Sequence, residues 1–91
     1  MLKIEDFKHC DEEWNLCWCR YKRGDRDFEA VLSFCFDPSK DDAWYQIVIG
    51  ECFEDDYKEM ETLRFNRLKE AIAHWNEYFK GDVDNEVHFT V

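Results

Sequence analysis

The most regular pattern in the chain runs from Asp56 to Gly81. Within it, apolar side chains recur at intervals of three and four residues, which places them on one side of an α-helix. The positions of this seam are Phe65, Leu68, Ile72, Trp75 and Phe79. Asp56 suits the start of such a helix because its carboxylate caps backbone N–H groups, and Gly81 suits its end. The pattern therefore predicts one long amphipathic helix over residues 56–81.

Three segments before this helix alternate between apolar and polar residues, as strands do. They cover residues 14–22, 27–36 and 44–53. Gly24 marks the turn between the first two, and residues 37–42 form a polar loop with a proline before the third. Because both connections are short, neighbouring strands are expected to run antiparallel. These segments predict a three-stranded meander.

The two ends of the chain complete the expected fold. Residues 86–91 alternate again and predict a short C-terminal strand. Leu2, Ile4 and Phe7 fit either a short strand or a helical turn over residues 4–9, and the helical turn is favoured. The sequence thus predicts a single domain over residues 1–91. Its fold class is α+β, in the order β-β-β-α-β, with the long helix packed on one face of the antiparallel sheet.

Strand parity assigns the side chains to two faces, since successive residues of a strand point in opposite directions. One face is almost wholly apolar and is expected to receive the helix. It holds Cys17, Cys19, Tyr21, Phe28, Ala30, Leu32, Phe34, Phe36, Tyr45, Ile47, Ile49 and Phe53. Glu51 shares this face, and Arg64 interrupts the apolar side of the helix. The two are therefore predicted to form an ion pair.

The opposite face also carries many apolar side chains, although one helix cannot cover both faces. They are Trp14, Leu16, Trp18, Val31, Cys35, Trp44, Val48 and Cys52. One interpretation is that the N-terminal segment or the last strand folds over part of this face. The other is that it binds a partner protein or a second copy of the chain. The expected contacts are then Trp14, Trp18, Trp44, Val31 and Val48, because tryptophan is a frequent anchor of protein interfaces.

Charge is the next constraint on function. The chain has 22 acidic and 12 basic residues, which gives a net charge of −10. This balance argues against nucleic acid or an anionic membrane as the binding partner, and it favours a protein with a basic surface. In the predicted meander, the start of the first strand, the loop between the second and third strands and the end of the helix share one end of the molecule. That end collects an acidic pole made of Asp11, Glu12, Glu13, Asp37, Asp41, Asp42, Asp82, Asp84 and Glu86. The opposite end carries a basic hairpin with Arg20, Lys22, Arg23 and Arg26.

Two interpretations of the acidic pole remain open. Charged loops usually serve solubility. Alternatively, carboxylates at one end of a molecule attract lysine and arginine as DNA phosphates do, so the pole is a candidate contact for a basic groove.

No motif for catalysis, a cofactor or a metal is found. Cys17-x-Cys19 lacks the second pair of ligands that a zinc site needs, and residues 82–86 lack the glycine and distal glutamate of a calcium loop. The histidines stand at no motif spacing from a nucleophile. The five cysteines, an odd number, favour reduced thiols and a cytoplasmic location. No apolar run has transmembrane length. We therefore expect a non-enzymatic protein without cofactors.

The layout and the charge resemble those of small acidic phage-encoded anti-CRISPR proteins and other DNA mimics. The resemblance covers the plan from Trp14 to Lys80 and the acids at 11–13, 37–42 and 82–86, without a residue motif. It implies an inhibitor in the bacterial cytoplasm that docks on a nuclease complex where DNA enters. One alternative is a small cytosolic domain that forms a homodimer through its tryptophan-rich face. Another is a metal- or thiol-dependent enzyme.

Overall fold

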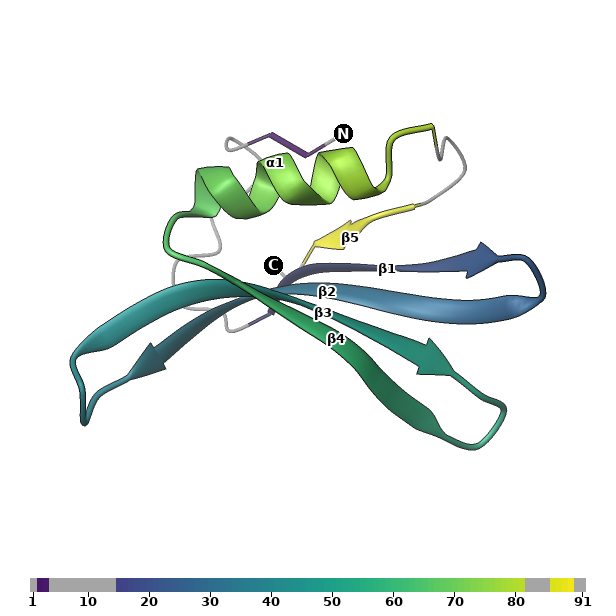
Figure 1. Cartoon of the computed structure of the whole chain (residues 1–91), viewed down its shortest axis with the longest axis horizontal. Coiled ribbons are helices and arrows are strands. Elements are labelled where there is room, and N and C mark those ends of the chain that lie inside the picture. Colours follow the sequence, from purple (N-terminus) through teal and green to yellow (C-terminus); the bar gives the residue numbers. More distant parts are fainter. Residues whose placement is uncertain (1, 4–14, 82–85, 90–91) are drawn as a thin grey trace.

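A computed structural model describes residues 2–3, 15–81 and 86–89 of the chain. Its described strands form one antiparallel sheet in the order β4-β3-β2-β1-β5, and one helix lies across a face of that sheet (Figure 1). The elements are β1 (Asn15–Arg23), β2 (Arg26–Asp37), β3 (Asp42–Cys52), β4 (Tyr57–Phe65), α1 (Leu68–Tyr78) and β5 (His88–Phe89). The predicted α+β class is confirmed. The helical turn expected over residues 4–9 lies outside the described residues.

The three meander strands are confirmed, each close to its predicted bounds. β1 pairs with β2 and β2 pairs with β3, both antiparallel. The turn between β1 and β2 uses Gly24 at φ 65°, a backbone conformation that glycine adopts without steric cost. β5 pairs with β1 and so extends the sheet at its β1 edge.

The predicted helix over residues 56–81 is wrong in its first half, because residues 57–65 form β4 along the free edge of β3. There, Leu63 and Phe65 point to the same side as their partners Ile47 and Tyr45. Most of β4 is exposed, so it shows little of the alternation that reveals a buried strand. A β-bulge at Met60 interrupts the pairing between Ile49–Gly50 and Glu59–Glu61.

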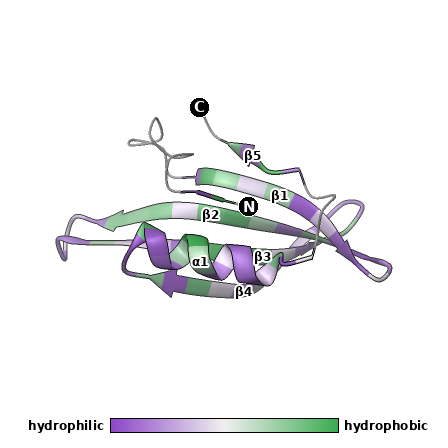
Figure 2. Ribbon diagram, turned by 90° about the horizontal axis from the view of Figure 1, so that it is seen from above, coloured by the Kyte–Doolittle hydropathy of each residue, from purple (hydrophilic) through white to green (hydrophobic). Residues whose placement is uncertain are grey.

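The remaining half of the seam is helical and packs against the sheet. Ala71, Ile72 and Trp75 are the buried residues of α1. Seen from above, α1 runs along the β3 and β4 side of the sheet, and its hydrophobic positions alternate with hydrophilic ones around the helix (Figure 2). Asp56 does not cap this helix. Its carboxylate accepts the Tyr57 N–H at 2.8 Å in the β3–β4 turn.

The core lies between α1 and the sheet face that was predicted to receive it. Its buried residues are Leu2, Leu16, Cys17, Cys19, Tyr21, Ala30, Leu32, Ile47, Ile49, Ala71, Ile72 and Trp75. Leu16 was predicted for the opposite face, but an irregularity between Asn15 and Cys17 lets it join the core. Leu2 is held against α1 by Asn76, whose side-chain amide accepts the Leu2 N–H at 2.8 Å and donates to its carbonyl at 3.0 Å.

The extra strand reverses the predicted direction of the helix. β4 returns along β3, so α1 starts on the side of the β2–β3 turn and ends on the side of the β1–β2 hairpin (Figure 1). The Tyr78 hydroxyl lies 2.8 Å from the Tyr21 hydroxyl at that end. The Arg23 guanidinium lies 5.4 Å from the centre of the Tyr78 ring. The helix therefore leaves the sheet at the end opposite to the one that the sequence pattern indicated.

The predicted ion pair between Glu51 and Arg64 is wrong for the same reason. Arg64 lies in β4 opposite Gln46, on the other face from Glu51. Glu51 instead accepts two hydrogen bonds from Arg26, at 2.8 Å from Nε and 2.6 Å from Nη2. Arg64 donates to Asp42 at 2.6 Å.

Candidate protein-binding surfaces

The sheet face opposite α1, called the open face below, has no described element packed on it (Figure 1). The pairing register aligns one residue from every strand in a row across its middle. In the order of the sheet this central row is Thr62, Val48, Val31, Trp18 and His88. Val48, Val31 and Trp18 are half-buried, and the His88 ring stacks on Trp18 with 4.4 Å between ring centroids. The centre of the open face is thus an apolar strip that retains contact with solvent.

Polar rows flank the central row on both sides. On the hairpin side, Arg20, Glu29 and Glu59 align with Gly50. Arg20 and Glu29 form an ion pair at 3.4 Å. This pair lies at the exposed surface, where such contacts contribute little to stability.

The row on the other side is tied together by hydrogen bonds. The Ser33 hydroxyl donates to the Asn15 side-chain oxygen at 2.9 Å, and Trp44 Nε1 donates to Gln46 Oε1 at 3.4 Å. Ser33 is buried, so its bond removes the cost of an unsatisfied hydroxyl.

Trp44 and Arg64 form a compact cluster near the β2–β3 turn. The Arg64 guanidinium lies 4.1 Å from the centre of the Trp44 ring, a cation–π distance. The same guanidinium donates to Asp42 at 2.6 Å. Tryptophan and arginine in one cluster are typical of the residues that dominate binding energy at protein interfaces.

Tyr57 closes the other end of the open face. Its ring lies directly over Gly50, so closely that a Cβ atom at position 50 would overlap the ring. The side chain nevertheless remains 46% exposed. Burial, with Glu29 and Glu59 nearby, raises the pKa of the Tyr57 hydroxyl. The absence of a side chain at Gly50 therefore allows a large aromatic ring to cover the sheet here.

The structure brings four of the five predicted face residues to the open face. Trp18, Val31, Trp44 and Val48 lie there, whereas Trp14 is outside the described residues. The interpretation that the last strand covers this face is wrong, because β5 extends the sheet at β1. Leu2, the first described residue, lies against α1 on the far side of the sheet. Residues 4–14 lie outside the described ranges.

The acidic pole does not assemble as predicted. Asp37, Asp41 and Asp42 lie at the β2–β3 turn, but α1 ends at the opposite end of the sheet and Glu86 precedes β5. Five predicted members lie outside the described residues: Asp11, Glu12, Glu13, Asp82 and Asp84. The cause is again β4, which carries the chain back before the helix begins.

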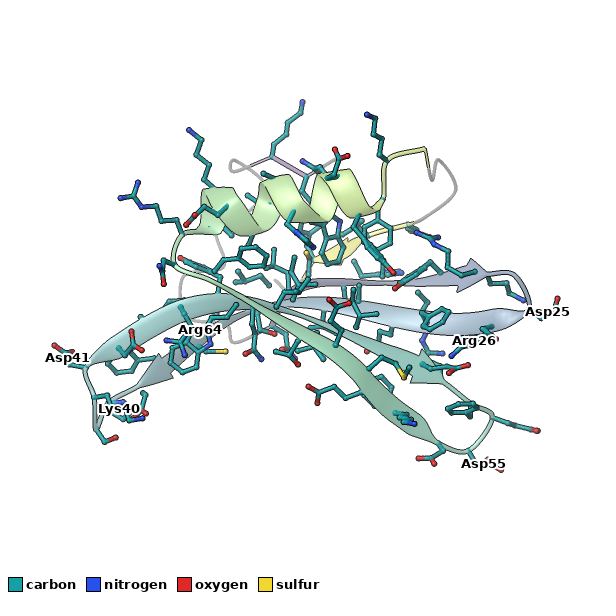
Figure 3. The ribbon with its side chains drawn as sticks, in the orientation of Figure 1. Asp25, Arg26, Lys40, Asp41, Asp55 and Arg64 are labelled. Carbon is teal, nitrogen blue, oxygen red and sulfur yellow. The ribbon has the colours of Figure 1, made fainter. Side chains whose placement is uncertain are left out.

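Carboxylates are instead found at both ends of the molecule. Asp41 projects at one end, while Asp25 and Asp55 project at the tips of two hairpins at the other (Figure 3). The β3–β4 turn also holds Glu54 and Asp56, and all three of its acids are exposed. The sequence pattern predicts a helix that starts at Asp56, so it does not predict this acidic turn between two strands.

Carboxylates pair with Arg20, Lys22 and Arg26 of the basic hairpin. Arg20 pairs with Glu29, Lys22 with Asp27 and Arg26 with Glu51, while the Arg23 guanidinium lies over the Tyr21 ring at 4.8 Å. The hydrogen bonds from Arg26 lower the pKa of Glu51 below its ordinary value. This hairpin is therefore less of a positive patch than its sequence indicates.

The four cysteines in the described ranges are buried or half-buried. Cys17 and Cys19 are fully buried, and the four described cysteines form no disulfide. Burial raises the pKa of Cys35 and of Cys52, which lowers the fraction of reactive thiolate. In the described part of the chain, no three histidine, cysteine, aspartate or glutamate side chains are grouped to hold a metal ion. The described helix is too short to cross a membrane.

No known protein family, characterised protein or solved structure matches this chain. The acidic turns and the open face are therefore the two candidate binding surfaces of this protein.

Proposed function

We propose that this protein is a non-enzymatic inhibitor that binds the basic surface of a nucleic-acid-binding protein, such as a CRISPR effector or another nuclease, and blocks the access of DNA. The observation that carries the proposal is the position of exposed carboxylates at both ends of a molecule 41 Å long. A surface that binds a nucleic acid backbone presents lysine and arginine side chains to its phosphates. The protein thus offers negative charge at widely separated points of contact.

The distribution of paired and unpaired charge supports this proposal. Arg20, Lys22 and Arg26 of the basic hairpin form ion pairs within the sheet, and Arg64 pairs with Asp42. In the described residues, the side chains of Asp25, Asp41, Glu54 and Asp55 form no ion pair. All four are exposed, so a partner's lysine and arginine can approach them.

Binding to purified CRISPR effector complexes, with competition by their target DNA, tests the proposal. The informative variant is Asp41→Lys with Asp55→Lys, which reverses one carboxylate at each end. Its control is Glu70→Lys with Glu77→Lys on the exposed side of α1, which changes the net charge equally. We expect the first pair to weaken binding by about tenfold or more, mainly through a slower association rate.

Salt provides the second readout. Affinity should fall as salt is raised from low to physiological concentration, because exposed charges are screened. Binding that both pairs of substitutions weaken equally would reduce the effect to net charge and remove the geometric argument. Binding that persists in the Asp41/Asp55 variant, or the absence of binding to every effector complex, would refute the proposal.

A further inference from the structure

We propose that the open face is the surface through which two copies of this chain associate. This inference is independent of the proposed inhibition, because it uses a different surface and none of the exposed turn carboxylates. Its starting point is the half-buried strip of Trp18, Val31 and Val48 in the central row. When another surface covers half-exposed apolar side chains that line up across a sheet, their removal from water stabilises the complex.

The charges of the open face narrow the choice of partner. Its three cations, Arg20, Lys22 and Arg64, are each paired with a carboxylate of the same face. No unpaired cation remains among the described residues of this face to attract nucleic acid or an acidic protein. A copy of the chain has a net charge of −10 and must avoid the acidic turns when it approaches. The open face is the described surface on which it meets paired charges and apolar groups.

The register also makes the face complementary to itself. A two-fold axis along the central row sets each strand antiparallel to its own copy, with Val31 and Val48 meeting their equivalents. The polar row on the hairpin side of one copy then lies over the opposite polar row, the one toward the β2–β3 turn, of the other copy. In β4 these rows contain Glu59 and Arg64, so Glu59 faces Arg64 of the partner subunit, twice per dimer. Opposite charges thus meet at both symmetric positions.

The size of the face is sufficient for a stable contact. Four long strands about 4.8 Å apart and about 30 Å long project onto roughly 600 Å². A surface of side chains exposes more area than its projection. A standard interface buries about 800 Å² on each partner, so the open face is of the required size. Trp44 with Arg64 and the ring of Tyr57 lie at its two ends, where they enlarge the contact.

Sedimentation equilibrium of the full chain at micromolar to 100-micromolar concentrations tests the inference. We expect the wild-type protein to have twice the mass of one chain. Val48→Asp, at the centre of the apolar strip, should reduce it to one chain because each copy would bury an unpaired charge. Its control is Phe53→Asp, since Phe53 is 51% exposed but lies outside the open face. Circular dichroism of both variants establishes that they are folded.

A second pair of variants tests the orientation of the copies. Glu59→Arg places like charges opposite Arg64 of the partner subunit and should raise the dissociation constant at least about tenfold. Glu61→Arg is its matched control, because Glu61 lies in the same strand on the side of α1. Equal effects of the two substitutions would contradict the two-fold arrangement. This comparison does not depend on a substitution in the apolar strip.

Three results would overturn the inference. The first is a wild-type protein that remains a single chain at the highest concentration. In that case, tryptophan fluorescence protected from acrylamide would show that the chain covers its own face, whereas quenching would show that the face remains in water. The second is a dimer that folded Val48→Asp leaves intact. The third is a dimer that Phe53→Asp dissociates, which would place the interface elsewhere.

Discussion

The hydroxyl groups of Tyr21 and Tyr78 form a 2.8 Å hydrogen bond that joins the β1–β2 hairpin to the last turn of α1. Tyr21 is 4% exposed, so its hydroxyl has little access to water when this partner is removed. Burial and the bond to Tyr78 raise the pKa of Tyr21 far above its ordinary value. The Tyr21 hydroxyl therefore stays protonated at neutral and mildly alkaline pH.

Tyr78→Phe should lower the free energy of unfolding by about 1–2 kcal/mol, because it leaves a buried hydroxyl without a partner. Urea denaturation followed by tryptophan fluorescence measures this loss. Tyr45→Phe is the control, since the described residues give the Tyr45 hydroxyl no hydrogen-bond partner and its removal should cost little. Equal losses in the two variants would show that the Tyr21–Tyr78 bond is not specifically stabilising.

The ionisation of Glu51 should make the stability of the fold depend on pH. Its pKa is lowered in the folded protein by hydrogen bonds from Arg26, so the folded state favours the ionised form. The resulting stabilisation is present above the unfolded pKa of about 4.3 and is lost as the pH falls through the lower folded pKa. Thermal unfolding of the wild type and of Glu51→Gln between pH 7 and pH 3 should give melting temperatures that converge in acid. A constant difference would rule out this coupling.

Gly50 and Tyr57 should be energetically coupled. Gly50→Ala forces the Tyr57 ring away from the sheet and should cost about 1–3 kcal/mol, as overpacking does. In a background of Tyr57→Ser, which has no ring, the same substitution should cost clearly less. A double-mutant cycle of unfolding free energies measures the difference. Additive effects would mean that the ring is not held over Gly50 in solution.

The thiols should react slowly. Cys17 and Cys19 are fully buried, and the pKa values of Cys35 and Cys52 are raised by burial. In a Cys10→Ser variant at pH 8, a chromogenic disulfide should modify all four thiols more slowly than it modifies a small free thiol, and at full speed after denaturation. A thiol that reacts rapidly in the native protein would contradict the described burial and revive a thiol-based activity.

The meander and its faces were predictable because their signals are local. Alternation in residues 14–53 sets strand parity, and the register confirms that Ala30, Leu32 and Ile47 share the core face. Apolar residues that must be buried on one side of a strand leave few alternatives. Gly24 marked the hairpin turn because a left-handed position favours glycine.

β4 could not be separated from the helix by apolar spacing, because Tyr57, Met60 and Phe65 also fit one side of a helix. Two charged residues, Glu61 and Arg64, interrupt this apolar side and argue against a helix there. Both are exposed in β4, Glu61 on the side of α1 and Arg64 on the open face, whereas in a helix they would interrupt an apolar face. The deciding factor is tertiary, since the edge of β3 satisfies its backbone hydrogen bonds through β4.

The position of β4 also explains why the predicted acidic pole does not form. One additional strand reverses the chain, so α1 ends at the β1–β2 hairpin and not beside Asp37, Asp41 and Asp42. β4 does not change the open face in the same way, because the positions of Trp18, Val31 and Val48 are set by the register of the meander strands. Features set by neighbouring strands were therefore predictable, and features set by the path of the helix were not.

The bulge at Met60 bears on whether the protein aggregates at high concentration. A straight outer strand is a template onto which further chains add, and such growth ends in fibrils. Here the outer strand is kinked at Met60 and carries Lys58, Glu59, Glu61 and Arg64 along a short length. Further chains are therefore hindered from adding along the β4 edge of the sheet.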